Sequence, residues 1–163
     1  QPVDAGETDA NWISNDRITR TLRGFKSRNV MVVADSCYSG VVFREEVPKR
    51  AQSYDSNTEY FRQLLEKKTR VALTSGGLEP VMDTLPGTRN SIFSGALISL
   101  LRNSNAITTA QQLFMEISEE VVSTASSMGL EQTPEYAGLR RSGHDGGDFL
   151  FVPLQGGQKG LDR

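Results

Sequence analysis

A short apolar segment that ends abruptly in a turn of small residues constrains the fold of this chain most. Residues 30–34 (Val-Met-Val-Val-Ala) are apolar and rich in β-branched side chains, and residues 35–40 (Asp-Ser-Cys-Tyr-Ser-Gly) follow directly. A run of this length next to a turn predicts a strand buried on both faces, as in parallel sheets covered by helices. The 163 residues are enough for one such domain.

Helical and strand patterns alternate along the chain. Apolar residues at helical spacing predict four helices, whose expected capping residues are Ser14, Ser56 with Glu59, Ser91 or Asn90, and Thr108 with Gln111. Further strands are predicted at residues 71–74 and 149–152, and a polar surface loop at residues 44–55. This order predicts an α/β layered domain with a mostly parallel sheet flanked by helices.

Composition excludes several classes of function. A net charge of −2 leaves no electrostatic footprint for nucleic acid or an anionic membrane. No apolar run reaches the roughly 20 residues of a membrane helix, and no signal peptide opens the chain. The single cysteine, Cys37, excludes an internal disulfide and favours a reducing compartment, so we expect a cytoplasmic protein. One cysteine and one histidine cannot form a Cys/His metal cluster, so we expect no metal site.

Two turns are expected where functional groups gather in such a sheet, at the carboxyl ends of its strands. They are residues 35–40 and residues 75–83. Cys37 lies in the first, among small residues that allow a ligand close to the backbone amides, and these can stabilise a thiolate or an oxyanion. The alternative is an inert buried cysteine, which is common in protein cores.

The segment from Val32 to Gly40 resembles the active-site strand of the caspase-like cysteine peptidases. The similarity is closest to the metacaspase and bacterial caspase-like branch, in which Asp-x-Cys-x-Ser-Gly follows an apolar strand. Other segments agree with this family in order and spacing, namely residues 2–5, 71–83, 91–97, 132–134 and 146–152. The resemblance implies that residues 1–163 are one portion of a caspase-like catalytic domain, with the family's N-terminal strands missing from this chain.

The resemblance implies a cysteine endopeptidase with Cys37 as the nucleophile. Asp35 points the same way as Cys37 if both lie on a strand, so its acid is placed to meet a basic substrate side chain. The matching aspartate of metacaspases lines the S1 pocket for Arg or Lys, and Ser75 matches another position that lines it. Glu79 and Asp83 are expected to add negative potential; the alternative is that both are solvated loop acids.

The catalytic base is not evident in the chain. The only histidine, His144, lies in Ser-Gly-His-Asp, whereas caspases place theirs about 50 residues before the cysteine. We therefore expect His144 to be a solvated loop residue and the base to come from an N-terminal fragment, because residues 1–5 look like a cut edge. Two alternatives stay open: a non-catalytic caspase-like pseudoenzyme or regulatory module, and a different hydrolase that pairs His144 with Cys37.

The remaining expectations concern activation and partners. Tyr38 follows the cysteine where many metacaspases have His and where bacterial relatives often have Tyr; this weakens any inference of calcium activation, and we expect no cofactor. Lys49 and Arg50 lie in the predicted loop and form a candidate autoprocessing site for an Arg/Lys-specific enzyme. The expected partners are the N-terminal fragment and a protein or peptide substrate, and the domain is expected to be a monomer of bacterial type.

Overall fold

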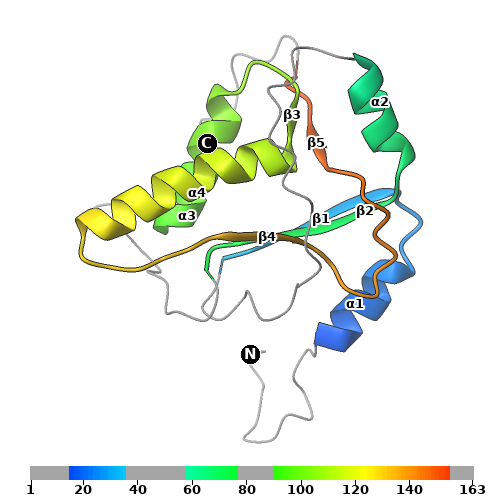
Figure 1. Cartoon of the computed structure of the whole chain (residues 1–163), viewed down its shortest axis with the longest axis horizontal. Coiled ribbons are helices and arrows are strands. Elements are labelled where there is room, and N and C mark those ends of the chain that lie inside the picture. Colours follow the sequence, from blue (N-terminus) through cyan, green and yellow to red (C-terminus); the bar gives the residue numbers. More distant parts are fainter. Residues whose placement is uncertain (1–14, 36–57, 77–89, 155–163) are drawn as a thin grey trace, which may run out of the picture.

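The computed structural model describes residues 15–35, 58–76 and 90–154, and helices and strands alternate along them (Figure 1). The elements are α1 (Asn15–Arg23), β1 (Asn29–Ala34), α2 (Thr58–Glu66), β2 (Thr69–Thr74), α3 (Ile92–Asn103), β3 (Thr108–Thr109), α4 (Ala110–Ser127), β4 (Glu135–Gly138) and β5 (Leu150–Phe151). The predicted mixed α/β class is therefore confirmed. None of the described helices is both long enough and apolar enough to cross a membrane.

The strands form two small sheets. The larger has the order β1-β2-β4, with β1 parallel to β2 and β4 antiparallel to β2, while β3 and β5 form an antiparallel pair. Helix α2 supplies the crossover that a parallel pair requires. The chain reaches β4 only after α3 and α4, and it enters the sheet in the opposite direction. A mostly parallel sheet was expected, but only one of the three described pairings is parallel.

Helices cover both faces of the larger sheet. Successive side chains of its strands point to opposite faces, and each face packs into its own apolar cluster with helices. Leu73 of β2 and Tyr136 of β4 join the cluster formed with α3 and α4. Their neighbours Ala72 and Ala137 join the cluster on the other face, with Leu22 of α1. Figure 1 shows α3 and α4 on one side of the sheet and α1 on the other, which gives three layers.

The central strand is β2 and not β1. All six residues of β2 are buried, whereas the residues of β1 are half-buried and Val33 is 46% exposed. The expectation that residues 30–34 are buried on both faces is therefore wrong. Its physical reason is position: β1 lies at the edge of the described sheet, and β2 lies between β1 and β4.

Helix α3 begins where its capping residue predicts, and α4 begins one residue later than expected. The Ser91 side chain accepts a hydrogen bond from the Ser94 amide at 2.9 Å and caps α3. In α4 the capping box is formed by Thr109 and Gln112, not by Thr108 and Gln111. Thr108 and Thr109 pair with β5, so the helix starts only after that pairing.

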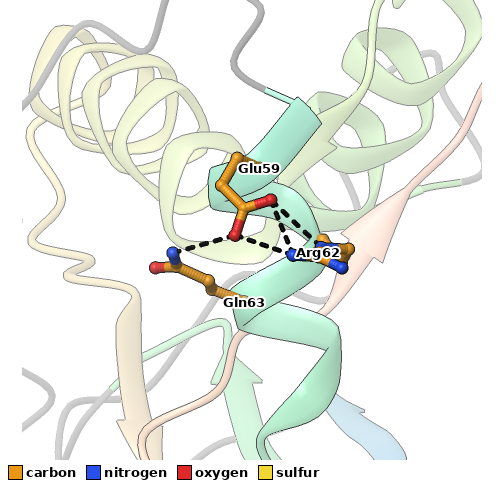
Figure 2. Close-up of polar contacts among 3 residues, drawn as sticks. All are labelled: Glu59, Arg62 and Gln63. Atoms are coloured by element: carbon orange, nitrogen blue, oxygen red, sulfur yellow. Dashed lines mark hydrogen bonds and ion pairs between the residues drawn. The ribbon is translucent and has the colours of Figure 1, made fainter.

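An exposed polar cluster runs along the outer face of α2 (Figure 2). The Glu59 carboxylate accepts bonds from Arg62 Nε and Nη2 at 3.1 and 3.0 Å, and from Gln63 Nε2 at 3.2 Å. The bond from Arg62, and then that from Gln63, holds the pKa of Glu59 below its usual value. Ser56, the other half of the predicted capping box, lies outside the described residues.

A buried arginine anchors α1 to the central strand. Arg70 of β2 is 0% exposed, and within the described residues its guanidinium donates hydrogen bonds to main-chain carbonyl oxygens only. Four of these carbonyls belong to the end of α1 and the turn that follows it, at Leu22, Phe25, Ser27 and Arg28. Burial lowers the pKa of Arg70. The bonds fix the path of the chain from α1 into β1.

A buried carboxylate joins the two sheets to α4. Asp148 is 6% exposed, and its Oδ1 accepts bonds from the Tyr136 hydroxyl at 2.6 Å and the Phe149 amide at 2.7 Å. Its Oδ2 accepts a bond from the Gln111 amide in the first turn of α4. Burial raises the pKa of Asp148 despite these bonds, and burial together with the charge of Asp148 raises the pKa of Tyr136.

Candidate active site

The structure brings two predicted site residues together at the carboxyl ends of β1 and β2. Ala34 is in register with Thr74, and the Ser75 amide donates a hydrogen bond to the Ala34 carbonyl at 3.0 Å. Asp35 and Ser75 therefore follow neighbouring parallel strands at the same edge of the sheet, as the sequence predicts. Asp35 is exposed, whereas Ser75 is 0% exposed. A direct contact between Ser75 and a substrate stays a prediction.

The Asp35 carboxylate is held by two serine hydroxyls of α3. Ser91 Oγ donates a hydrogen bond to Asp35 Oδ2 at 2.6 Å, and Ser94 Oγ donates a second, short one to the same oxygen. The carboxylate therefore lies at the N-terminus of α3, where the helix dipole favours negative charge. Its position is fixed from the side of α3, and Oδ1 accepts no bond from the described residues.

Ser91 is a helix cap, as its sequence position predicts, and it also has a second role that the sequence does not reveal. Its Oγ accepts from the Ser94 amide and donates to Asp35, so one hydroxyl links the start of α3 to the end of β1. Ser94 was missed entirely, because 59 positions separate it from Asp35 in the sequence. The only local signal is that Ser91 and Ser94 are three residues apart, which places both in the first turn of a helix.

Gln132 is a further buried polar residue at this edge of the sheet. Its Nε2 donates to the Ser75 carbonyl at 2.8 Å, and its side chain is 3% exposed. Its Oε1 is buried and has no hydrogen-bond partner in the described part of the chain. An unsatisfied buried acceptor costs about 1–3 kcal/mol, which a donor from a ligand or a water would recover. In the sequence, residues 132–134 stand out only as one of the segments that resemble the caspase-like family.

His144 lies beside the start of β2, at the opposite end of that strand from Ser75. Its Nδ1 accepts a hydrogen bond from the Arg70 amide at 3.1 Å, and the neighbouring Asp145 amide donates to the Lys68 carbonyl. Arg70 and Ser75 are five residues apart on an extended strand, a separation of about 16 Å. His144 lies in a loop as expected, but it is half-buried and bonded to β2 rather than fully solvated. This position argues against its pairing with a group that follows β1.

The other predicted site residues lie outside the described residues. They are Cys37, Glu79 and Asp83, together with the candidate processing site at Lys49 and Arg50. The part of the chain that is described holds no group of three or more metal-ligating side chains. Comparisons with models of protein families, with curated proteins and with solved structures found no match to this chain.

Proposed function

We propose that this chain is the nucleophile-bearing part of a caspase-like cysteine endopeptidase that cleaves proteins after Arg or Lys. The observation that carries the proposal is the exposed Asp35 carboxylate, which two hydroxyls hold at the carboxyl end of β1, two residues before Cys37. A fixed negative charge beside a nucleophile selects substrates with a basic side chain, as the acid of the trypsin pocket does. Ser75, Glu79 and Asp83 complete the proposed S1 pocket.

In the proposed reaction, the Cys37 thiolate attacks the carbonyl carbon after the basic residue. The Cys37 amide forms part of the oxyanion hole that stabilises the tetrahedral oxyanion. The carbon–nitrogen bond then breaks, the leaving amine takes a proton from the base, and a thioester forms on Cys37. Water hydrolyses the thioester and restores the thiol. A cysteine thiol has a pKa near 8.5, so a base must remove its proton at neutral pH.

The base in this proposal is a histidine on an N-terminal fragment outside this sequence. The location of His144 supports that assignment, because its Nδ1 is engaged by β2 at the end away from Asp35. The enzyme would act in the cytoplasm without a cofactor, and it would process itself at Lys49 or Arg50. Mass spectrometry that finds this loop intact in fully active enzyme would contradict the processing step.

One observation favours a second candidate, a non-catalytic caspase-like module. The only histidine of the chain is bonded to Arg70 and cannot serve as a base at the Asp35 end without leaving β2. A chain of this kind could act as a regulatory partner. The full-length reading frame discriminates the two candidates: a histidine in Ser-Gly-His-Gly encoded upstream of Cys37 favours the peptidase.

The decisive experiment measures cleavage of fluorogenic peptides that end in Arg, Lys or Asp by the full-length gene product. Cys37→Ala should abolish cleavage, and Asp35→Asn should lower kcat/KM for Arg and Lys peptides by about a hundredfold, the size of a hydrogen bond between charged groups. Asp145→Asn is the matched control, since Asp145 is an exposed acid at the His144 end of β2. Cleavage after Asp would overturn the role of Asp35. No cleavage, with no upstream histidine encoded, would favour the non-catalytic module, whereas no cleavage with that histidine present would point to a missing activator.

A further inference from the structure

We infer that Ser94 is a positioning residue that makes the Asp35 site accept Arg and Lys side chains about equally. The inference rests on the proposed function and adds a determinant of specificity to it. It starts from the two hydroxyls of α3 that donate to the same oxygen, Asp35 Oδ2.

The hydrogen-bonding capacity of Asp35 is divided unequally between its two oxygens. A carboxylate oxygen has two lone pairs, and Ser91 and Ser94 occupy both of those on Oδ2. Oδ1 accepts nothing from the described residues and belongs to an exposed side chain. With respect to the described residues, a ligand cation therefore meets a carboxylate with one oxygen that accepts no other bond.

This division weakens the usual advantage of arginine. A guanidinium binds a carboxylate most strongly with two parallel N–H bonds, one to each oxygen. An ammonium group is a compact donor and needs only one oxygen. When Oδ2 is already saturated, Arg and Lys both bind through Oδ1, and the gain from the bidentate fork is lost.

Ser94 is the residue through which this arrangement can be tested. The Ser91 hydroxyl also caps α3, so its removal disturbs the helix as well as the carboxylate. The Ser94 hydroxyl bonds to Asp35 from a half-buried position in the first turn of the helix. Replacing Ser94 with alanine frees one lone pair of Oδ2 and leaves the cap of α3 in place.

The test compares Arg and Lys peptides cleaved by the full-length gene product carrying Ser94→Ala, Ser94→Thr or Ser99→Ala. The unmodified protein should cleave both with kcat/KM values within about threefold of each other. In Ser94→Ala the Arg:Lys ratio should rise about five- to tenfold, the size of one net hydrogen bond. Ser94→Thr keeps a hydroxyl and should keep the original ratio, and so should Ser99→Ala, which changes an exposed serine of the same helix.

A purely structural role for Ser94 would lower both activities together and leave their ratio unchanged. An unchanged ratio in Ser94→Ala, or a preference for Arg above about tenfold in the unmodified protein, would therefore overturn the inference.

Binding to a Cys37→Ala protein separates this inference from the proposed activity. The N-acetyl methylamides of arginine and lysine would be titrated into that protein, with and without Ser94→Ala, and followed by NMR. Comparable binding that shifts toward the arginine probe in Ser94→Ala supports the inference even if no peptide is ever cleaved. Failure of both probes to bind near Asp35 would overturn it, even if the full-length protein proved to be a peptidase.

Discussion

Asp35 and Asp148 both lie beside the first turn of a helix, yet the chain treats the two carboxylates differently. Asp35 is exposed, and its two donors are serine hydroxyls that converge on one oxygen. Asp148 is buried, and both of its oxygens accept bonds, two of them from main-chain amides. Among the described residues, hydrogen bonds reach both oxygens of Asp148 but only one oxygen of Asp35. A carboxylate available to a ligand differs from a structural one in this respect.

Truncation of each acid gives the largest contrast. Asp148→Ala leaves the Tyr136 hydroxyl and the Phe149 amide buried without acceptors, and it should lower the free energy of unfolding by about 3 kcal/mol. Asp35→Ala removes an exposed side chain and should cost about 1 kcal/mol or less. Urea unfolding followed by circular dichroism measures both. An equal loss of unfolding free energy in the two variants would contradict the view that Asp148 is structural and Asp35 is available to a ligand.

Glycines near the two acids should respond in opposite directions to an added methyl group. In Gly147→Ala the new Cβ would lie 2.3 Å from Thr69 Oγ1 and 3.0 Å from the Lys67 carbonyl, so we expect a loss of about 2 kcal/mol. Gly95 lies in α3 next to Ser94, and an added Cβ there meets nothing within 4 Å. Gly95→Ala should therefore stabilise the chain by roughly 0.5–1 kcal/mol through helix propensity. Thermal unfolding of both variants is the measurement, and a stabilising Gly147→Ala would contradict the close approach.

The titration of Asp148 should make the free energy of unfolding depend on pH. Burial raises its pKa in the folded chain, so the folded chain keeps this proton to a higher pH than the unfolded chain does. The stability from the protonated form is fully present below the unfolded pKa and is lost as pH rises through the folded pKa. Each unit of elevation is worth about 1.4 kcal/mol.

The measurement is the unfolding free energy of the unmodified chain and of Asp148→Asn from about pH 4 to about pH 7. The difference between the two isolates what the titration of Asp148 contributes to stability. The unmodified chain should lose stability relative to the variant as pH rises. A difference that is constant across this range would show that Asp148 titrates alike in both states.

The smallest contrast concerns the two helix caps. Ser91→Ala and Thr109→Ala each remove one cap, and each should cost about 1 kcal/mol of stability. Only Ser91→Ala also removes a donor to Asp35 Oδ2, so only that variant should change the relative binding of the arginine and lysine probes. A similar effect of Thr109→Ala on the probes would mean that loss of helix order, rather than the bond to Asp35, governs binding.

Local patterns in the sequence predicted the elements that carry strong signals of their own. The apolar runs at residues 30–34 and 71–74 gave β1 and β2, and Ser91 marked the start of α3. Strand β4, Glu-Tyr-Ala-Gly, was not predicted, because it is short and lacks a β-branched side chain. It becomes a strand by pairing with β2, which is a tertiary effect that outweighs intrinsic propensity.

The candidate site could be predicted only as far as chain direction allowed. Parallel strands predict that Asp35 and Ser75 lie at one edge, and the structure places them there. The bonds from Ser94 to Asp35 and from the Arg70 amide to His144 join positions 59 and 74 residues apart. No local rule reaches such distances, so the anchoring of Asp35 and the engagement of His144 could not be foreseen.

The hydrogen bonds from the Arg70 guanidinium affect which mutations the turn after α1 can tolerate. The guanidinium holds the turn after α1 through carbonyl oxygens at Phe25, Ser27 and Arg28, and a carbonyl oxygen is present whatever the side chain. The turn can therefore exchange its exposed side chains freely while its course stays fixed. The path of the turn therefore depends mainly on one residue of β2, Arg70. Substitutions in the turn itself need not move β1, the strand that leads to Asp35.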